Sequence, residues 1–489
     1  MNIIRKALAS LLVVSGLVAY AQDPWLHIYY PGGNSYQTFD MSEVLDITFD
    51  ETSGSMIVNT PEGNTVAYGS SMDFFRIGPN VAALHIDTDD SSVTEITSKT
   101  TYLDATINFF GRGRQDDFTQ RVRIRGRGNS TWGYDKKPYR LKFDVKQRML
   151  LPKKAKNFVL LANYIDESMM RNFVAFNFGQ IIEMPWINYA EPVDVYLNNI
   201  YKGSYMLTEK VGFNNGSVDL PAVDEARSIM LELDNNAVKS DEIYWESGYF
   251  DSANGFFLPV KVKDPDAPVD PTEAKNWQQK WRDDFDSFLS TVDGGNESAI
   301  FQACDIESLV RYIMVFNICC NQEIDHPKSV FIYKTEGGKW YFGPCWDFDW
   351  AFGYSPTYSK GQTPGSWNWE WYPTYENPLL GYQTASNGSN DGRAGVFFYK
   401  LCKTQAFQKR FKEVWDDFYN NRREAFWQAF DAYAESLRPS ANAQGLTRGQ
   451  YKNFDTNVLT LRNWVENRIE YINSDPNKGL WEDGVFDKF

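Results

Sequence analysis

Histidine is scarce in this 489-residue chain, and its scarcity excludes two classes of hydrolase. The three histidines, His27, His85 and His326, are scattered, and no Cys/His spacing resembles a zinc site. This argues against a metallohydrolase that relies on histidine ligands. A Ser-His-Asp hydrolase would in practice have to use His326, and no Gly-x-Ser-x-Gly nucleophile elbow accompanies it.

Cysteine is also scarce. Five residues of this type are few for a chain of this size if it is exported, and an odd number cannot pair completely into disulfides. Cys319 and Cys320 fall within an apolar helical pattern over residues 309–320, where a thiol usually behaves as a small buried side chain. We therefore predict that these two cysteines belong to the core.

Long apolar runs are absent after the N-terminal region, so the sequence predicts no transmembrane helix. Near the start, Arg5 and Lys6 precede an apolar run over residues 7–19, and residues 19–21 have the small-x-small form of a cleavage site. We expect residues 1–21 to be a signal peptide. The mature protein should then be exported to the periplasm, the cell surface or the extracellular medium, without spanning a membrane.

Positive charge is in deficit overall but concentrated in one segment. The formal net charge is −15, which disfavours nucleic acid as a partner. Residues 112–156, however, hold fifteen Lys and Arg against four Asp, and a positive island in an acidic protein predicts a local anionic ligand. Arginines alternating with apolar residues over 121–125 are also typical of the polar face of a half-buried strand, which would explain about half of these charges.

Apolar periodicity predicts the α+β class, with strands mainly in the first half and helices in the second. Residues 22–79 show short strand patterns broken by Gly and Asn turns, which predicts a small β-rich N-terminal domain that ends near Gly78-Pro79-Asn80. Residues 80–489 would form the main domain. Within it we expect strands up to about residue 143, a helix from Asp166 to Ile182, a hairpin over 193–207, helices over 276–292 and 305–321, a strand pair at 330–333 and 340–342, and a helical region over 396–475.

The run Trp346-Asp347-Phe348-Asp349 follows an apolar segment and carries two carboxylates two residues apart. Mg²⁺ takes a small number of carboxylate oxygens and leaves its other positions to water and phosphate, so this pair fits a divalent-cation site. An isolated pair would more simply be a solvated loop at the end of a strand. The residues around it decide between these interpretations.

A second motif lies in the positive island. Residues 125–131, Arg-Gly-Arg-Gly-Asn-Ser-Thr, form a glycine-containing turn between two predicted strands, where backbone N–H groups and arginines can approach an anion. The turn matches neither a Walker A loop nor the kinase Gly-x-Gly-x-x-Gly pattern, and by itself a tight hairpin would explain it. The strand that follows, residues 136–143, presents lysines within reach of the turn.

With these motifs in order, the sequence resembles the CotH kinase family, secreted or surface proteins with an atypical protein-kinase-like fold. The resemblance covers roughly residues 81–475. It rests on Arg123–Gly126 with Asn129-Ser130, Lys136–Phe143, Leu160–Tyr164 with Asp166 and Met170–Asn172, Tyr196–Asn198 with Tyr201–Tyr205 and Thr208-Glu209, Asp325 with Lys328-Ser329 and Tyr333, and Trp346–Asp349 with Phe352-Gly353.

The resemblance implies a two-lobed kinase-like domain that binds ATP and Mg²⁺, with Mn²⁺ or Ca²⁺ as alternatives, and phosphorylates Ser or Thr hydroxyls of a protein. It also implies roles for individual residues. Lys137, or alternatively Lys142, would contact the phosphates with Glu209 as acidic partner. Asp325 would be the catalytic-loop carboxylate, Asp347 and Asp349 would bind the metal, and Arg171 would be a structural clamp to Asp166 or Glu209. The nucleotide-contacting residues would be Arg125, Asn129, Ser130, Lys137 and Lys142.

One position departs from the family pattern, and a second hypothesis competes. Ser329 stands where many relatives carry Asn, and its hydroxyl would be a weaker metal ligand than the Asn carboxamide oxygen.

The alternative is a catalytically weak or inactive binding module for a glycan or a protein, with the acidic pair holding Ca²⁺. It draws on the aromatic-rich residues 366–375, whose rings suit sugar stacking but also suit a satellite core under a loop.

Overall fold

The computed structural model describes most of the chain outside its N-terminal segment. The described residues are 25–29, 36–41, 43–50, 52, 55–61, 65–68, 74–78, 81–111, 117–234, 244–246, 256, 258–325, 327–354, 374–381, 394–448, 453–475, 479–481, 484 and 486. The predicted signal peptide, His326 and most of the aromatic-rich segment 366–375 lie outside these residues.

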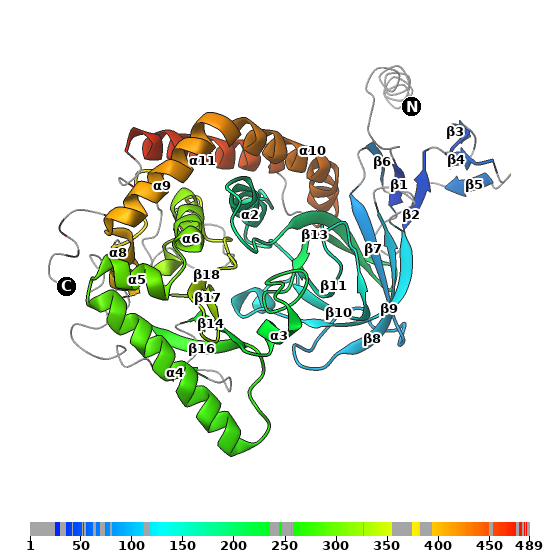
Figure 1. Ribbon diagram of the computed structural model, residues 1–489. Helices are drawn as coiled ribbons and strands as arrows, with labels where there is room; N and C mark the ends of the chain where they lie inside the picture. The colour runs from blue at the N-terminus through cyan, green and yellow to red at the C-terminus, as the bar shows by residue number, and fades with distance from the viewer. Residues whose placement is uncertain are drawn as a thin grey trace.

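Two small antiparallel sheets stand at the N-terminal end, beside the rest of the molecule (Figure 1, blue). Their shared apolar cluster contains Leu26, Ile28, Met56 and Val58. One sheet has the order β2-β1-β6 and the other β3-β4-β5, with bounds β1 Trp25–Tyr29, β2 Tyr36–Asp40, β3 Asp46–Asp50, β4 Ser55–Asn59, β5 Thr65–Tyr68 and β6 Phe74–Gly78.

A closed barrel of seven strands follows, in the order β10-β11-β13-β12-β7-β8-β9. Its bounds are β7 Ala82–Thr88, β8 Leu103–Phe110, β9 Phe118–Gly126, β10 Tyr139–Gln147, β11 Ala155–Leu161, β12 Ala190–Leu197 and β13 Ile200–Glu209. The period-two patterns predicted strands here, but local alternation does not show whether a sheet closes. Closure is the feature that the structure adds to the predicted α+β class.

The barrel wall sorts side chains by polarity. Val122 and Ile124 are buried inside, whereas Arg123 and Arg125 of the same strand lie on the outer face. The interpretation of the 121–125 alternation as one polar strand face is therefore confirmed. The predicted hairpin is confirmed as well, because β12 and β13 pair through Asn198 and Asn199, both at positive φ (47° and 65°), which a tight hairpin turn requires.

The second half of the chain builds a five-stranded sheet, in the order β15-β16-β14-β17-β18, surrounded by helices (Figure 1). The strands are β14 Ser228–Leu233, β15 Tyr244–Glu246, β16 Pro259–Asp264, β17 Val330–Thr335 and β18 Trp340–Phe342. The helices are α2 Arg171–Ile181, α3 Ala222–Glu225, α4 Pro271–Asp293, α5 Glu297–Ala303, α6 Ile306–Cys319, α8 Ala394–Cys402, α9 Gln405–Asp417, α10 Arg423–Arg448 and α11 Phe454–Ser474, with a π-helical turn η8 Phe418–Arg422.

Helix α2 begins later than predicted. The Asp166 carboxylate does accept the backbone N–H of Arg171 (2.9 Å), but its other oxygen accepts the N–H and the hydroxyl of Ser168 (3.0 and 2.6 Å). These bonds hold residues 166–170 in a turn, in which Met169 has φ 57°. Asp166 was predicted to be the N-cap residue, but Met170 occupies that position, and the aspartate binds the first helical N–H from the preceding loop.

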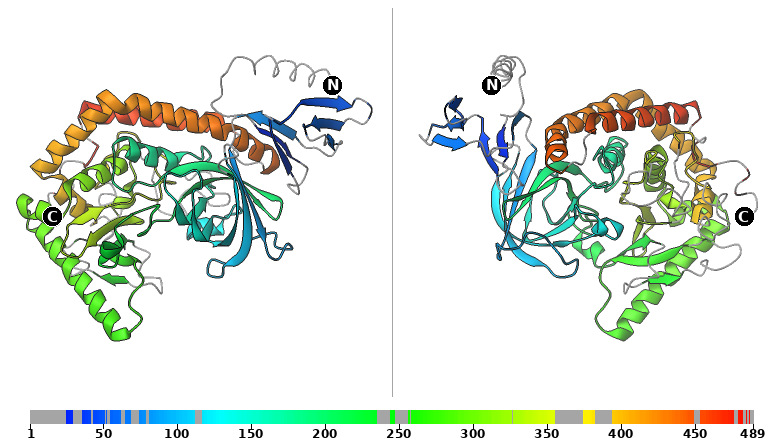
Figure 2. Two further views of the ribbon diagram at one scale, coloured as in Figure 1. Left: turned by 45° about the vertical axis from the view of Figure 1, so that its right-hand side comes forward. Right: turned by 180° about the vertical axis from the view of Figure 1, so that it is seen from behind.

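Helix α10 joins the barrel to the helical half, and α10 and α11 run along one side of the molecule (Figure 2). Near its start, the carbonyl oxygen of Phe426 accepts the Asn177 amide of α2 (3.2 Å). Towards its end, the Ser440 hydroxyl donates to buried Asp194 of β12 (3.0 Å). One helix thus fixes the position of the barrel against the second half.

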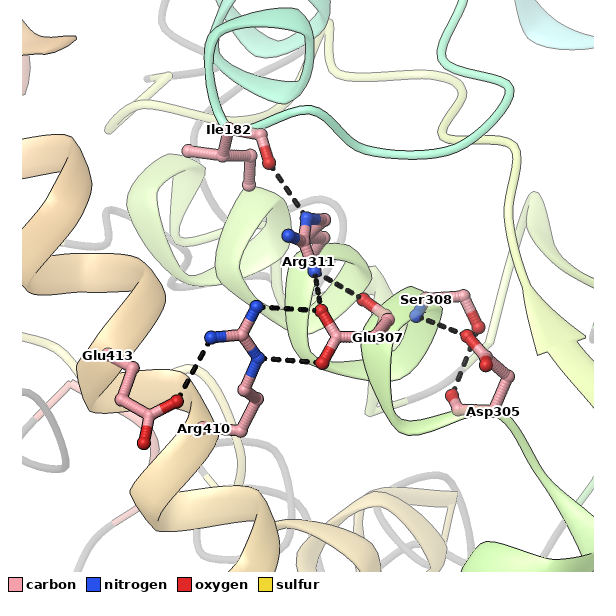
Figure 3. Close-up of polar contacts among 7 residues, drawn as sticks. All are labelled: Ile182, Asp305, Glu307, Ser308, Arg311, Arg410 and Glu413. Atoms are coloured by element: carbon pink, nitrogen blue, oxygen red, sulfur yellow. Dashed lines mark hydrogen bonds and ion pairs between the residues drawn. The ribbon is translucent and has the colours of Figure 1, made fainter.

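A carboxylate on α6 connects three helices (Figure 3). Glu307 accepts two hydrogen bonds from Arg410 of α9 (2.6 and 2.9 Å) and one from Arg311, which also donates to the carbonyl of Ile182 after α2 (2.8 Å). The bonds from Arg410 and Arg311 lower the pKa of Glu307 to about 2. The side chain stays partly exposed, so these ion pairs orient the helices more than they stabilise them.

All five cysteines are buried and unbridged, which confirms Cys319 and Cys320 as core residues. Across the described residues, every helix is too short or too polar to cross a membrane.

Arg468 of α11 is fully buried and should be a major determinant of stability. Its guanidinium donates to carbonyl oxygens of Asn317, Tyr375, Asn377 and Gly479 (2.7–3.2 Å) and to the Asn317 side chain (2.7 Å). Arg468→Met would leave these buried acceptors without a donor, so we expect a loss of roughly 3 kcal/mol or more in the free energy of unfolding by urea titration.

The matched control is Arg462→Met on the same helix, because Arg462 lies at the surface, where it pairs with Asp431 and covers the rings of Trp427 and Phe430 (4.4 and 5.6 Å). We expect that change to cost at most about 1 kcal/mol. Equal losses in the two variants would show that the buried carbonyl network is not what stabilises α11.

Candidate active site

Acidic side chains from distant parts of the sequence meet at one edge of the five-stranded sheet. Strands β14 and β17 are antiparallel, with Leu233 opposite Val330, so the end of β14 lies beside the start of β17. β17 is in turn antiparallel to β18, with Ile332 opposite Phe342, so the segment that leaves β18 reaches the same edge. The residues at this edge are Glu232, Asp234, Ser329, Asp347 and Asp349.

The backbone at this edge is held in an uncommon conformation. Asp347 and Ser329 both have positive φ (69° and 53°), a region that costs free energy for residues other than glycine. The Ser329 hydroxyl donates to the Asp347 carboxylate, and the Asn321 side chain donates to the carbonyl oxygen of Asp347 (3.2 Å). Strained backbone that neighbouring groups hold in place is common at functional sites.

The second carboxylate is held from helix α2. Asn172 donates its amide N–H to Asp349 and accepts the backbone N–H of Phe348 (2.8 Å). One residue earlier, Arg171 binds the Asp166 carboxylate and donates to the carbonyl oxygen of Ala351 (3.1 Å). The predicted clamp of Arg171 is thus formed with Asp166.

A third carboxylate, Glu323, joins the pair from the short 3₁₀ helix η5, Gln322–Ile324. Burial and the charge of Asp347 raise the pKa of Glu323 to about 8, and the same two causes raise the pKa of Asp349 to about 8. Burial, followed by the charge of Glu232, raises the pKa of Asp347. The carboxylates are therefore close enough to disfavour one another's ionisation.

The site is open to solvent although it is surrounded by protein. Asp347 has an exposed side chain, and Asp349 and Glu323 are partly exposed, yet burial is the first cause of each pKa shift. A side chain that solvent reaches while protein surrounds it on most sides lies in a cleft. We conclude that these acids line the cleft where the five-stranded sheet meets the barrel.

Two cations partly neutralise the acids. Arg127, in the glycine-containing turn after β9, attracts Asp347 and Asp349, and its guanidinium lies over the ring of Trp346 (5.5 Å). Lys328, next to Ser329, attracts Glu323 and Asp347. The turn predicted to approach an anion thus contributes Arg127 to the surroundings of the acidic pair.

The other predicted nucleotide-contacting residues are spread out. Arg125 and Lys142 are on the outer barrel face, and Asn129 and Ser130 are exposed in the turn. Lys137 donates to the carbonyl oxygen of Trp132 (2.8 Å) and lies over that ring.

Glu209 sits at the end of β13 inside the barrel wall. It is buried beside Gly216 and Ala155 and accepts the backbone N–H of Tyr189 (3.1 Å). No ion pair joins it to Lys137 among the described residues. The predicted ion pair between Lys137 and Glu209 is therefore not formed among the described residues. Alternation along β13 turns Glu209 towards the inside of the barrel, and Lys210, the next residue, faces the outside.

Asp325 also differs from its prediction in position. It is fully buried, accepts the backbone N–H of Gly381 (2.9 Å), and packs against Gly395 of α8. Glu323, two residues earlier, is the side chain that interacts with Asp347 and Asp349. No sequence motif pointed to Glu323, Glu232 or Asp234, and the only local signal for Glu323 was its nearness to Asp325.

The donor set of this cleft fits Mg²⁺. No three His, Cys, Asp or Glu side chains are arranged to hold a metal by themselves anywhere in the described ranges. Mg²⁺, however, usually binds one or two carboxylates and completes its octahedron with water and substrate phosphates. Asp347 and Asp349 supply hard oxygen atoms, and their mutual repulsion is the electrostatic condition that a divalent cation relieves.

The chain was also compared with known proteins. Residues 122–472 match the sequence model of a family described as CotH kinase protein. A search of curated proteins found no match.

Glu209 predicts a pH dependence of stability. Burial raises its pKa from the usual 4.5 to about 7, so between these values the folded protein binds a proton that the unfolded chain releases. The contribution of Glu209 to stability is complete below pH 4.5 and is lost as the pH rises through 7. In Glu209→Gln, which keeps an acceptor for Tyr189, this loss should be absent.

The measurement is urea unfolding of parent and variant from pH 4.5 to 8. The free energy of unfolding of the parent should fall relative to that of the variant by about 3 kcal/mol over this range. Parallel curves for the two proteins would mean that Glu209 ionises normally.

Proposed function

This chain belongs to the CotH kinase family, and on that premise we propose that it is an exported kinase that transfers the terminal phosphoryl group of ATP to Ser or Thr hydroxyls of a protein. One observation carries the proposal: an open cleft in which Asp347, Asp349 and Glu323 face Arg127 and Lys328. Phosphoryl transfer requires this combination, a carboxylate pair for a metal beside cations for phosphate oxygens.

Each side chain has a task in this proposal. Asp347 and Asp349 would hold Mg²⁺, which when bound would neutralise charge on the phosphates. Arg127 and Lys328 would approach the phosphate oxygens from opposite parts of the fold, one from the barrel and one from the sheet. Ser329 orients Asp347 through its hydroxyl, so its departure from the family's Asn is compatible with a supporting role for this position.

Glu323 is our candidate for the base. The oxygen of the acceptor hydroxyl forms a bond to the terminal phosphorus, the bond from that phosphorus to the bridging oxygen breaks, and ADP leaves. The hydroxyl proton passes to Glu323. The raised pKa of Glu323 comes from burial and from the charge of Asp347, and Mg²⁺ held by Asp347 would offset that charge. With the metal bound, Glu323 would be ionised near neutral pH and able to accept the proton.

Export remains part of the proposal. It is supported by the sequence of residues 1–21, in which two basic residues, an apolar run and a small-x-small site follow one another.

Nucleotide binding should depend on a divalent cation held by Asp347. In Asp347→Asn the amide is a weaker metal ligand and one charge of the acidic cluster is lost, so we expect Mg²⁺-dependent ATP binding to fall at least about tenfold without a drop in the thermal transition. Calorimetric titration with ATP in Mg²⁺ and in chelator measures this. The same ATP affinity in both conditions for the parent would remove the metal from the proposal.

Turnover should distinguish Glu323 from Asp325. General-base contributions are on the order of 10² to 10⁴ in rate, so Glu323→Gln should bind Mg·ATP normally and lose at least about a hundredfold in transfer to casein or another Ser/Thr-containing protein. Asp325→Asn retains an acceptor for Gly381 and should keep most of the activity. The reverse ranking of the two variants would return the catalytic role to Asp325.

A further inference from the structure

Four basic side chains gather next to the acidic cleft, on the outer face of the barrel and the adjoining sheet. Arg125 of β9 and Arg140 of β10 are directly opposite each other in the strand register. Arg140 and Lys263 of β16 both repel Lys210, which follows β13. We call these four residues, Arg125, Arg140, Lys210 and Lys263, the cation cluster.

The carboxylates near the cation cluster do not neutralise its positive charge. Asp264, the last residue of β16, and Asp266, in the loop that follows, are the two carboxylates that attract Lys210. One oxygen of Asp264 already accepts the backbone N–H of Phe213 (2.8 Å), and Asp266 is exposed. Lys263 is drawn towards Glu232 (3.0 Å), which is itself part of the acidic edge. A net positive charge therefore remains in a protein whose total charge is −15.

The cluster also has unused hydrogen-bond donors. The Nε atoms of Arg125 and Arg140 are buried and have no hydrogen-bond partner. Arg140 makes one long bond to the Asn157 side chain (3.3 Å), while Arg125 lies over the ring of Tyr102 (5.0 Å). Buried donors without acceptors are costly, and two facing arginines with free N–H groups form a ready site for a planar or tetrahedral anion.

The cluster adjoins the acidic cleft but is separate from its counter-ions. Arg127 and Lys328 are the cations that attract Asp347. Arg140 lies further from Asp347 than Arg127 does, and it repels Arg127. Lys263 contacts the acidic edge only through its ion pair with Glu232. A nucleotide bound at Asp347 would have its phosphates served by Arg127, Lys328 and the metal. The cation cluster would face whatever lies next to the nucleotide.

We propose that the cation cluster is an acceptor subsite that selects an acidic protein segment, by binding a carboxylate or phosphate group near the reacting hydroxyl. This inference rests on the proposed kinase function. Arginine forks match both groups through paired N–H donors, and a half-buried position protects the interaction from screening. The acceptor is thereby defined by chemistry: a Ser or Thr with acidic neighbours, not basic ones.

The test uses the mature chain with Mg²⁺ and ATP and two synthetic peptides that contain one serine flanked by Glu in one peptide and by Gln in the other. The Glu peptide should have the higher kcat/KM, by about tenfold or more. Arg140→Gln and, independently, Lys210→Gln should each remove most of this preference while the affinity for Mg·ATP stays unchanged. Two variants are used so that a folding defect in one does not decide the result.

Arg123→Gln is the matched control. Arg123 lies on the same face of β9 but is engaged by Asp144 (3.0 Å), so its loss should leave the preference intact. No preference between the peptides, or an equal loss in Arg123→Gln, would overturn the proposal. A loss of Mg·ATP affinity in Arg140→Gln with the peptide preference retained would assign the cluster to the nucleotide instead.

A measurement of peptide binding tests the acidic-segment site independently of the kinase function. Fluorescence anisotropy of the labelled Glu peptide, without nucleotide, should show binding that weakens with salt and with Arg140→Gln. If no peptide is phosphorylated but this binding is found, the kinase function fails and the acidic-segment site stands. If transfer occurs without selective binding or preference, the function stands and the site fails.

Discussion

The concentration of negative charge at one edge of the five-stranded sheet is the constraint on which the candidate site depends. The pairing of β14 with β17 and of β17 with β18 delivers carboxylates from three segments to one place. Burial raises the pKa values of Glu323, Asp347 and Asp349, and repulsion between these like charges raises them further. Such an edge is stable only when protons, side-chain cations or a metal offset the charge.

The barrel supplies the opposite charge. Its turn after β9 places Arg127 against Trp346 and the acidic pair, and it contributes every residue of the cation cluster except Lys263, which comes from the sheet. The acids thus belong to the sheet and most of the facing cations to the barrel, so an anionic ligand with a bound metal fits between the two. Helix α10 holds the barrel and the second half in this relative position, because it forms hydrogen bonds with α2 near one end and with Asp194 of β12 towards the other.

Motifs in the sequence predicted the parts of the site that are local. Asp347, Asp349 and Ser329 were named from short patterns, and the structure brings them to the same edge. Glu232, Asp234 and Lys210 were not named, because each is an ordinary charged residue in or after a strand. Their importance comes only from strands that pair across a long stretch of sequence, which single-sequence patterns do not report.

The choice between Glu323 and Asp325 illustrates the same limit at short range. Both acids lie within a few residues, and a short 3₁₀ turn decides which one faces Asp347 and which one packs beneath Gly395. Likewise, alternation along β13 predicts that Glu209 and Lys210 face opposite sides, but not which side faces the cleft. The sequence by itself determined the α+β class, the hairpin at Asn198, the polar strand face over 121–125 and the acidic pair, because these depend on local periodicity and turn chemistry. Only the tertiary structure decided barrel closure, the partners of each charge and the cation cluster, because electrostatic energies depend on distances between segments that the order of residues does not contain.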